Sequence, residues 1–131
     1  MFLKICRDLG EAVAKAVKET GLRVTVVASS DMTHAGAMYN QMPPSGMSAD
    51  EFARNQDKYA LKEILALSPE KLFNAVSEYD ISMCGFGAVA AALYAAKALG
   101  AKKSELVDYR TSAESTGDIN QVVGYGGVLI T

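Results

Sequence analysis

The sequence predicts an α/β domain in which helices flank a small β-sheet. Four stretches carry apolar residues at helical spacing, and three shorter stretches are rich in apolar and β-branched residues. The chain has 131 residues, half of them apolar, which suits one folded domain with one hydrophobic core. Residues 1–131 are therefore expected to form a single domain.

The first two predicted elements are a helix and a strand. Through residues 2–20 apolar side chains recur every three or four positions, and Gly21 ends this amphipathic helix. Cys6 belongs to the apolar stripe, so we expect it to fill the core. Residues 22–28 are nearly all apolar and partly β-branched, which predicts an interior strand covered on both faces.

A long loop and a second helix follow. Paired prolines and small residues predict that 29–46 has no regular structure. Ser48 and Glu51 have the spacing of a capping box, in which the serine hydroxyl accepts a backbone N–H three residues later. A helical apolar pattern then runs to Ser68, so the second helix is expected between these signals.

Two more helices are predicted after this one. Ser68 followed by Pro69 is typical of a helix start, with an N-cap and then a proline at the first helical position, and Asp80 ends the helix. A glycine-bearing bend over 81–87 precedes an alanine-rich helix over 88–99.

Two strands complete the predicted fold. They cover 105–109 and 122–130 and are separated by a polar loop over 110–120. The glycine run 124–127 follows a strand and opens no helix, so it predicts close backbone packing and not a phosphate-binding loop. Three strands make a thin sheet, which leaves room for further strands from another polypeptide.

Composition argues against several classes of partner. Thirteen basic and fifteen acidic residues give a net charge of -2, with no basic run, so nucleic acid is not an expected partner. The charge-free stretch 81–96 is shorter than the roughly 20 apolar residues that cross a membrane. The N-terminus has no apolar signal core, which predicts a cytoplasmic protein. In that reducing compartment Cys6 and Cys84 are not expected to form a disulfide.

Asp31 and His34 directly follow the predicted strand 22–28, where α/β sheets place their ligands. His34 is the single histidine, and a carboxylate three residues away can hold its imidazole in one tautomer. The plainer interpretation is that Asp31 caps a turn and His34 is an ordinary loop side chain. Spacing alone leaves both interpretations open.

Cys84 lies at or just before the start of the predicted helix 88–99. The unpaired amides and positive dipole end of a helix favour a thiolate, which is both a nucleophile and a soft metal ligand. The alternative is a small buried apolar residue at a glycine bend.

Together, Asp31, His34 and Cys84 suit two chemistries. One is a nucleophilic Cys-His-Asp set, with the amides of Gly85 and Phe86 as oxyanion donors. The other is a metal site with His34 and Cys84 as ligands and Asp31 in support. Neither set is complete in this chain, because a metal site needs at least one more ligand.

Three segments occur in one order along the chain: Ser29-Ser30-Asp31-Met32-Thr33-His34, then Met83-Cys84-Gly85-Phe86-Gly87 leading into the alanine-rich helix, then Val122-Val123-Gly124-Tyr125. Together they resemble the Memo family, called AmmeMemoRadiSam system protein B in bacteria and archaea. The resemblance runs from the first helix to Thr131 and identifies the chain as similar to the C-terminal half of a Memo protein.

The resemblance implies a fold like that of class III extradiol dioxygenases, with a mixed sheet flanked by helices and a cleft at the strand ends. Asp31 and His34 match the family's Ser-Ser-Asp-x-x-His motif, and Cys84 matches the cysteine of its x-Cys-Gly motif. In the family these residues line a pocket with two further histidines, so copper or iron binding through His34 and Cys84 is implied.

Memo proteins are about twice as long as this chain, and the resemblance places the two other histidines in an N-terminal half. The implied partner is therefore an N-terminal-half Memo-like chain or a second copy. The leading hypothesis is a redox or oxygen-handling metalloprotein that resembles a metal-dependent oxidoreductase. The alternatives are a non-catalytic protein that binds a peptide, a small molecule or a metal in the same cleft, and a Cys-His thiol hydrolase.

Overall fold

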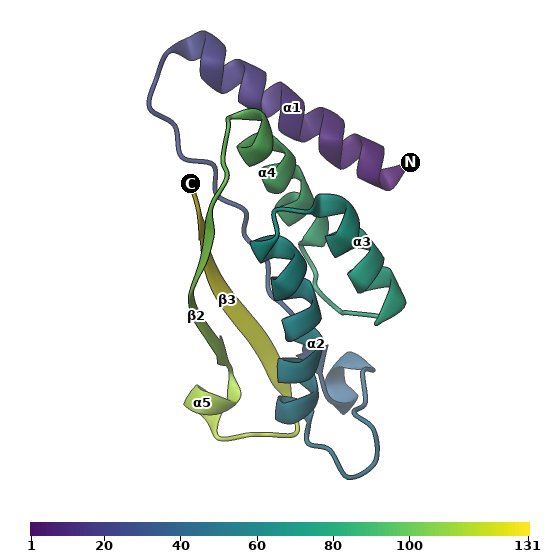
Figure 1. Ribbon diagram of the computed structural model, residues 1–131. Helices are drawn as coiled ribbons and strands as arrows, with labels where there is room; N and C mark the ends of the chain where they lie inside the picture. The colour runs from purple at the N-terminus through teal and green to yellow at the C-terminus, as the bar shows by residue number, and fades with distance from the viewer.

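The computed structural model describes all 131 residues, Met1 to Thr131. Helices pack against one another and against a long two-stranded ribbon (Figure 1). In chain order the elements are α1 (Phe2–Thr20), β1 (His34–Ala35), the 3₁₀ helix η1 (Ala37–Tyr39), α2 (Ala49–Leu65), α3 (Pro69–Glu78), α4 (Phe86–Ala98), β2 (Ser104–Thr111), α5 (Ala113–Thr116) and β3 (Val122–Ile130).

The helices begin and end at the signals that the sequence carries. Gly21 ends α1 with a φ of 64°, a left-handed conformation that glycine adopts without steric cost. The Ser48 hydroxyl accepts the N–H of Glu51 at 3.1 Å at the start of α2. Ser68 accepts the N–H of Lys71 at 3.3 Å before α3, whose first residue is Pro69. The predicted capping at these ends is confirmed.

The sheet has three antiparallel strands in the order β1-β3-β2. The predicted strands 105–109 and 122–130 are confirmed as β2 and β3, which pair from Ser104–Ile130 to Thr111–Gly124. Only antiparallel pairs occur in this chain, whereas the resemblance implied a mixed sheet. Helix α2 packs on one face of the sheet, and the other face exposes apolar side chains such as Val107.

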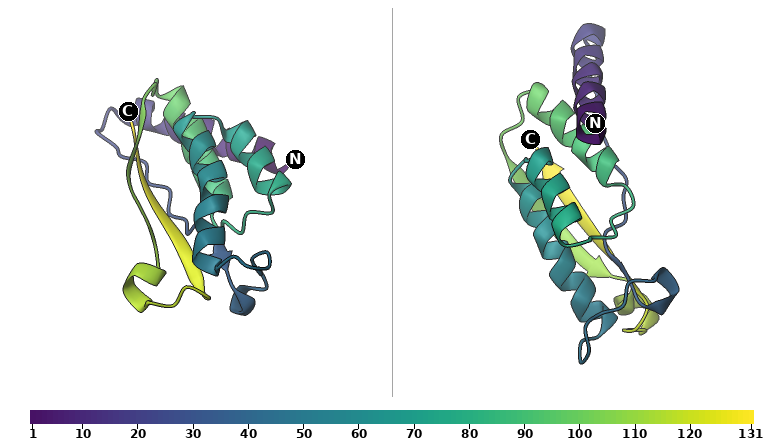
Figure 2. Two further views of the ribbon diagram at one scale, coloured as in Figure 1. Left: turned by 60° about the horizontal axis from the view of Figure 1, so that its bottom comes forward. Right: turned by 90° about the vertical axis from the view of Figure 1, so that its right-hand side faces the viewer.

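The main core lies between the sheet and helices α2, α3 and α4. Leu72 of α3 and Leu93 of α4 are almost fully buried there. Helix α1 lies outside this core and packs along α4 (Figure 2), where a Cβ on Gly10 would approach the Cβ of Tyr94 to 2.7 Å. Cys6 is 4% exposed in this interface, so its predicted burial is confirmed, although it lies in a smaller apolar cluster and not in the main core.

The predicted strand over 22–28 is wrong. This segment carries no strand pairing, and Val27 is 80% exposed where burial on both faces was expected. A β-strand exists only where a neighbouring backbone accepts its hydrogen bonds, and nothing in this chain pairs with 22–28. The apolar pattern identified the composition of a strand but not the presence of its neighbours.

Three other boundaries differ from the prediction. The loop 29–46 contains β1 and η1, because its backbone pairs with β3 at His34 and Ala35. The loop 110–120 contains the short helix α5. Helix α4 starts at Phe86, two residues before the predicted start. None of the helices combines the length and the apolar character that a membrane span requires.

Candidate functional site

Two backbone segments, 30–34 and 82–85, lie beside each other and build the site. The Ser30 hydroxyl accepts the N–H of Gly85 at 2.9 Å, and the Ser82 hydroxyl accepts the N–H of His34 at 2.8 Å. A Cβ on Gly85 would come within 2.8 Å of the Ser29 carbonyl oxygen, so only glycine allows the segments to approach this closely.

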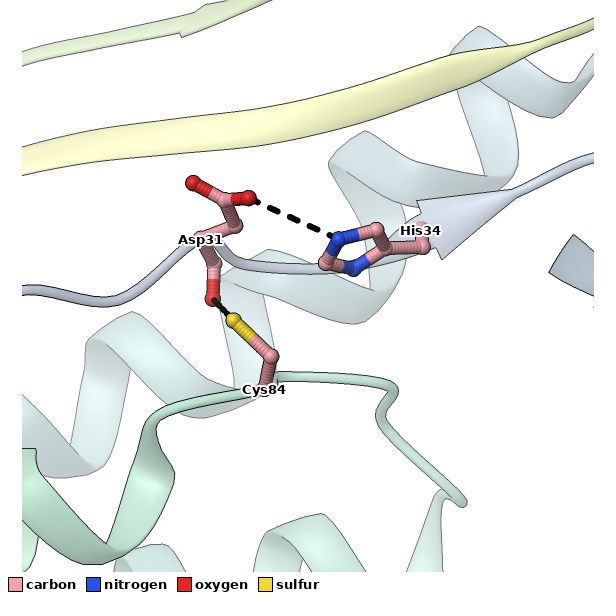
Figure 3. Close-up of side chains that lie close together, drawn as sticks. All are labelled: Asp31, His34 and Cys84. Carbon is pink, nitrogen blue, oxygen red and sulfur yellow. Dashed lines mark hydrogen bonds and ion pairs between the residues drawn. The ribbon is translucent and has the colours of Figure 1, made fainter.

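This pairing brings together the three side chains that the sequence predicted as a site. One ligand atom from each of Asp31, His34 and Cys84 lies within 4.8 Å of the other two. Nε2 of His34 is 3.6 Å from Oδ2 of Asp31, and Sγ of Cys84 is 4.0 Å from the Asp31 carbonyl oxygen (Figure 3). The chain contains one such cluster of potential metal ligands.

Ser82 determines the tautomer of His34. Nδ1 of His34 lies 3.0 Å from the Ser82 carbonyl oxygen, which can only accept a hydrogen bond. Nδ1 must therefore carry the proton in the neutral imidazole, which leaves the lone pair on Nε2. Nε2 is the atom that faces Asp31, so the ring presents an acceptor to the cluster. Tyr39 packs against the His34 ring in a T-shaped arrangement, with ring centroids 5.2 Å apart.

Local structure explains why Ser82 and Cys84 face the site. Ile81 and Met83 are buried in the main core at 4% and 5% exposure. The intervening residues, Ser82 and Cys84, therefore point to the opposite side, toward 31–34. Cys84 is exposed, so its interpretation as a buried apolar residue is wrong. It lies just before the N-terminus of a helix, as predicted, because α4 begins at Phe86.

A buried carboxylate, Asp57 of α2, supports the segment that carries His34. Oδ1 of Asp57 accepts the N–H of Thr33 at 2.9 Å, and Oδ2 accepts the hydroxyl of Tyr109 at 2.5 Å. Burial raises the pKa of Asp57, although both hydrogen bonds favour its ionised form. The same burial, with the Asp57 charge beside it, raises the pKa of Tyr109.

Gly124 of β3 makes room for this carboxylate. A Cβ at Gly124 would overlap Oδ2 of Asp57, and one at Gly126 would approach the Met32 sulfur to 3.1 Å. The Gly124 carbonyl accepts the N–H of Met32, and its N–H donates to the Thr33 carbonyl, each at 2.9 Å. Close backbone packing, predicted from the glycine run, is confirmed at these two positions.

Sequence reasoning missed Ser82 and Asp57. Asp57 had a detectable signal, because it lies on the apolar stripe of α2 with Ala53, Ala60 and Leu61, all of them buried. A charged residue on such a stripe is paired or functional. Ser82 had no comparable signal, since a lone serine between two apolar residues is common.

The donor set suits a soft or borderline transition metal. A neutral imidazole nitrogen, a thiol and a carboxylate are the ligands that zinc, copper and iron sites use. Ligand atoms around a tetrahedral ion lie roughly 3.5 Å apart, close to the 3.6 Å between Asp31 and His34. The sulfur of Cys84 is exposed and lies within 4.8 Å of a ligand atom from each of the other two residues. The three residues therefore fit a metal ion but offer it at most three protein ligands.

Comparisons with known proteins agree with the sequence motifs. A family model described as Memo-like protein matches residues 3–129. A MEMO1 family protein of Methanocaldococcus jannaschii is 39% identical over 123 residues, which cover 94% of this chain and 39% of the relative. Relatives from Nitrosopumilus maritimus and Methanopyrus kandleri are 38% and 34% identical, over 96% and 97% of this chain and 41% of each relative. The chain spans about two fifths of the length of these relatives.

Proposed function

Because the chain belongs to the Memo-like family, we propose that it contributes His34 and Cys84 to a copper- or iron-binding site for redox or oxygen-handling chemistry. The observation that carries this proposal is the convergence of Asp31, His34 and Cys84 within 4.8 Å. Thiolate with imidazole favours copper, iron or zinc over magnesium and calcium. The bound ion would supply the redox chemistry, and this chain would supply two or three of its ligands.

The protein side of the site has a clear division of roles. His34 offers Nε2, because Ser82 holds the proton on Nδ1. Cys84 offers an exposed sulfur, which can be reached by a metal ion or by a partner. The Asp31 carboxylate lies 3.6 Å from Nε2, and because both atoms present lone pairs, a metal ion between them would bind them together. Asp57 acts one step further away, through the Thr33 amide.

The missing ligands are proposed to come from outside this chain. His34 is the single histidine of the sequence, and the chain corresponds to about two fifths of its relatives. We propose an N-terminal-half Memo-like chain, or alternatively a second copy, as their source. We extend this proposal to a metal-dependent oxidoreductase, similar to the class III extradiol dioxygenases, that acts on a small molecule.

The geometry of the site supports a thiol hydrolase less well than a metal site. Such an enzyme needs free amides beside Cys84 to stabilise an oxyanion. The nearest of these, the N–H of Gly85, donates to the Ser30 hydroxyl at 2.9 Å. A binding protein without turnover would use the same three residues, and metal and activity measurements separate it from an enzyme.

Metal content tests the proposal. The chain is purified anaerobically, alone and with a coexpressed N-terminal-half Memo-like polypeptide, and copper, iron and zinc are measured by elemental analysis. Near-stoichiometric copper or iron is expected in the coexpressed complex. This metal should be lost in the Cys84→Ser and His34→Gln variants. Cys6→Ala is the matched control, because it removes the other thiol, which lies far from the cluster in the α1–α4 interface.

Three outcomes would contradict the proposal. Metal that persists in both Cys84→Ser and His34→Gln would place the ion elsewhere. Zinc alone, without oxygen consumption by the complex, would favour the non-catalytic binding protein. Covalent capture of an electrophile at Cys84 in metal-free protein, followed by turnover, would favour the thiol hydrolase.

A further inference from the structure

Residues Val24 to Ala28 form an extended segment whose backbone has no partner. Between Arg23 and Ser30 no backbone N–H or C=O makes a hydrogen bond with another backbone group. Val24 and Val27 are 47% and 80% exposed. Unpaired β-branched residues with a free edge are the features that proteins normally cover, because they invite pairing with another strand.

Strand β3 has a second free edge that faces this segment. On the edge of β3 that faces β1, only Val122 and Val123 pair with a strand, and Gly124 makes further backbone hydrogen bonds. Residues 126–130 therefore have no neighbouring strand on this edge. The segment and this part of β3 line opposite sides of one groove of about 770 Å³. Figure 2 shows the segment passing from α1 toward β1 near the C-terminal end of β3.

The groove is apolar between its two backbone edges. Seventeen of its 22 lining residues are hydrophobic, and α4 contributes Ala92, Leu93 and Ala96. A hydrocarbon ligand would cover the unpaired N–H and C=O groups along both edges without bonding them, which is costly. A ligand of this groove must therefore bond the unpaired backbone groups and also cover apolar side chains. An extended peptide does both, since its backbone pairs with the edges and its apolar side chains contact α4.

We propose that this groove receives a β-strand, with apolar side chains facing α4, from a polypeptide carrying the part of the Memo sequence that this chain does not span. About three fifths of the length of each relative lies outside the match. The added strand joins Val24–Ala28 to β3 and makes one continuous sheet. This explains why 22–28 has the composition of an interior strand but no strand structure.

The groove also reaches the metal cluster. Ser30 and Met83 line it, and each directly precedes a cluster residue, Asp31 and Cys84. A strand in the groove therefore runs beside the cluster. The docking itself does not depend on a bound metal, so it can be tested separately from the proposed function.

Hydrogen exchange tests the docking. The probe is the part of the Methanocaldococcus jannaschii relative that the match leaves out, supplied in two formats. In one it is coexpressed with this chain as a separate polypeptide. In the other this chain replaces the matched 123 residues of the relative, so that covalent linkage raises the effective concentration. Amides of 24–28 and 126–130 are expected to exchange at least about tenfold more slowly than in the free chain.

A pair of matched variants locates the contact. Val24→Asp puts a charge into the groove, and Val107→Asp puts the same charge on an exposed site that does not line it. Both side chains are substantially exposed in the free chain, so neither variant should unfold it. Slower exchange is expected to disappear in Val24→Asp and to persist in Val107→Asp.

Two results would overturn the proposal. One is unchanged exchange of 24–28 and 126–130 in both formats, while α2 and α3 keep the exchange of the free chain. The other is slower exchange that appears without the probe and rises with the concentration of this chain, which would identify a second copy as the occupant.

Discussion

Ser82 holds His34 by three contacts. Its hydroxyl accepts the N–H of His34 at 2.8 Å and donates to the His34 carbonyl at 3.0 Å, and its own carbonyl lies 3.0 Å from Nδ1. Backbone and ring of His34 are thus fixed by one residue from a segment 48 positions away. The position of Nε2 therefore depends on Ser82 as much as on the local sequence around His34.

Replacing Ser82 by alanine should weaken metal binding. The variant loses both hydroxyl contacts to the His34 backbone but keeps the carbonyl that meets Nδ1. A loss of about 10- to 100-fold in metal affinity is expected, as for other residues that orient a ligand. Calorimetric titration with Cu(I) or Fe(II) measures it. Ser77→Ala is the matched control, because Ser77 is exposed on α3, and equal affinities in the two variants would argue against this role of Ser82.

The two thiols should differ strongly in reactivity. Cys84 is exposed, whereas Cys6 is 4% exposed and burial raises the pKa of its thiol. Iodoacetamide should therefore modify Cys84 in the folded chain and reach Cys6 only after denaturation. Mass spectrometry of the two cysteine peptides over time measures this. Equal labelling of both under native conditions would contradict the packing of α1 on α4.

The stability of the chain should depend on pH through Asp57. Because burial raises the folded-state pKa of Asp57, the folded state binds this proton more tightly than the unfolded state does. Its contribution to stability is complete below the ordinary aspartate pKa of about 4. It is lost as pH rises through the raised folded-state pKa.

The matched comparison for this effect is Asp57→Asn, which keeps the shape of the side chain. The free energy of unfolding, measured in urea from about pH 4 to pH 8, should fall with pH in the wild type relative to Asp57→Asn. The difference between the two proteins removes the contribution of the other carboxylates. A difference that does not change with pH, or changes in the opposite direction, would contradict a raised pKa.

Two glycines of β3 should respond very differently to alanine. A Cβ on Gly124 would overlap the Asp57 carboxylate, whereas the nearest atoms to a Cβ on Gly127 are 4.0 Å away. Gly124→Ala is therefore expected to destabilise the chain by about 1–3 kcal/mol, the usual cost of overpacking. Gly127→Ala should change stability by less than about 0.5 kcal/mol. Urea unfolding curves of the two variants provide the comparison, and similar midpoints would argue against close packing at Gly124.

The helix ends and the two long strands could be predicted from short-range signals in the sequence. The N-caps Ser48 and Ser68 act on amides three residues away, so their effect is readable from the local sequence. Strands β2 and β3 were predictable because they are close in the chain and pair with each other. The predicted strand 22–28 failed because its pairing needs a neighbour that this chain does not contain.

In the candidate site, too, local features could be predicted from the sequence and long-range contacts could not. By itself, the sequence determined which residues have suitable chemistry, Asp31, His34 and Cys84, because side-chain type and nearby helix or strand signals are local properties. Only the tertiary structure decided that residues 53 positions apart converge, that Ser82 selects the tautomer of His34 and that Asp57 supports its backbone. These relationships depend on how α2, β3 and the segment before α4 pack together, and packing across such separations leaves no local signal in the chain.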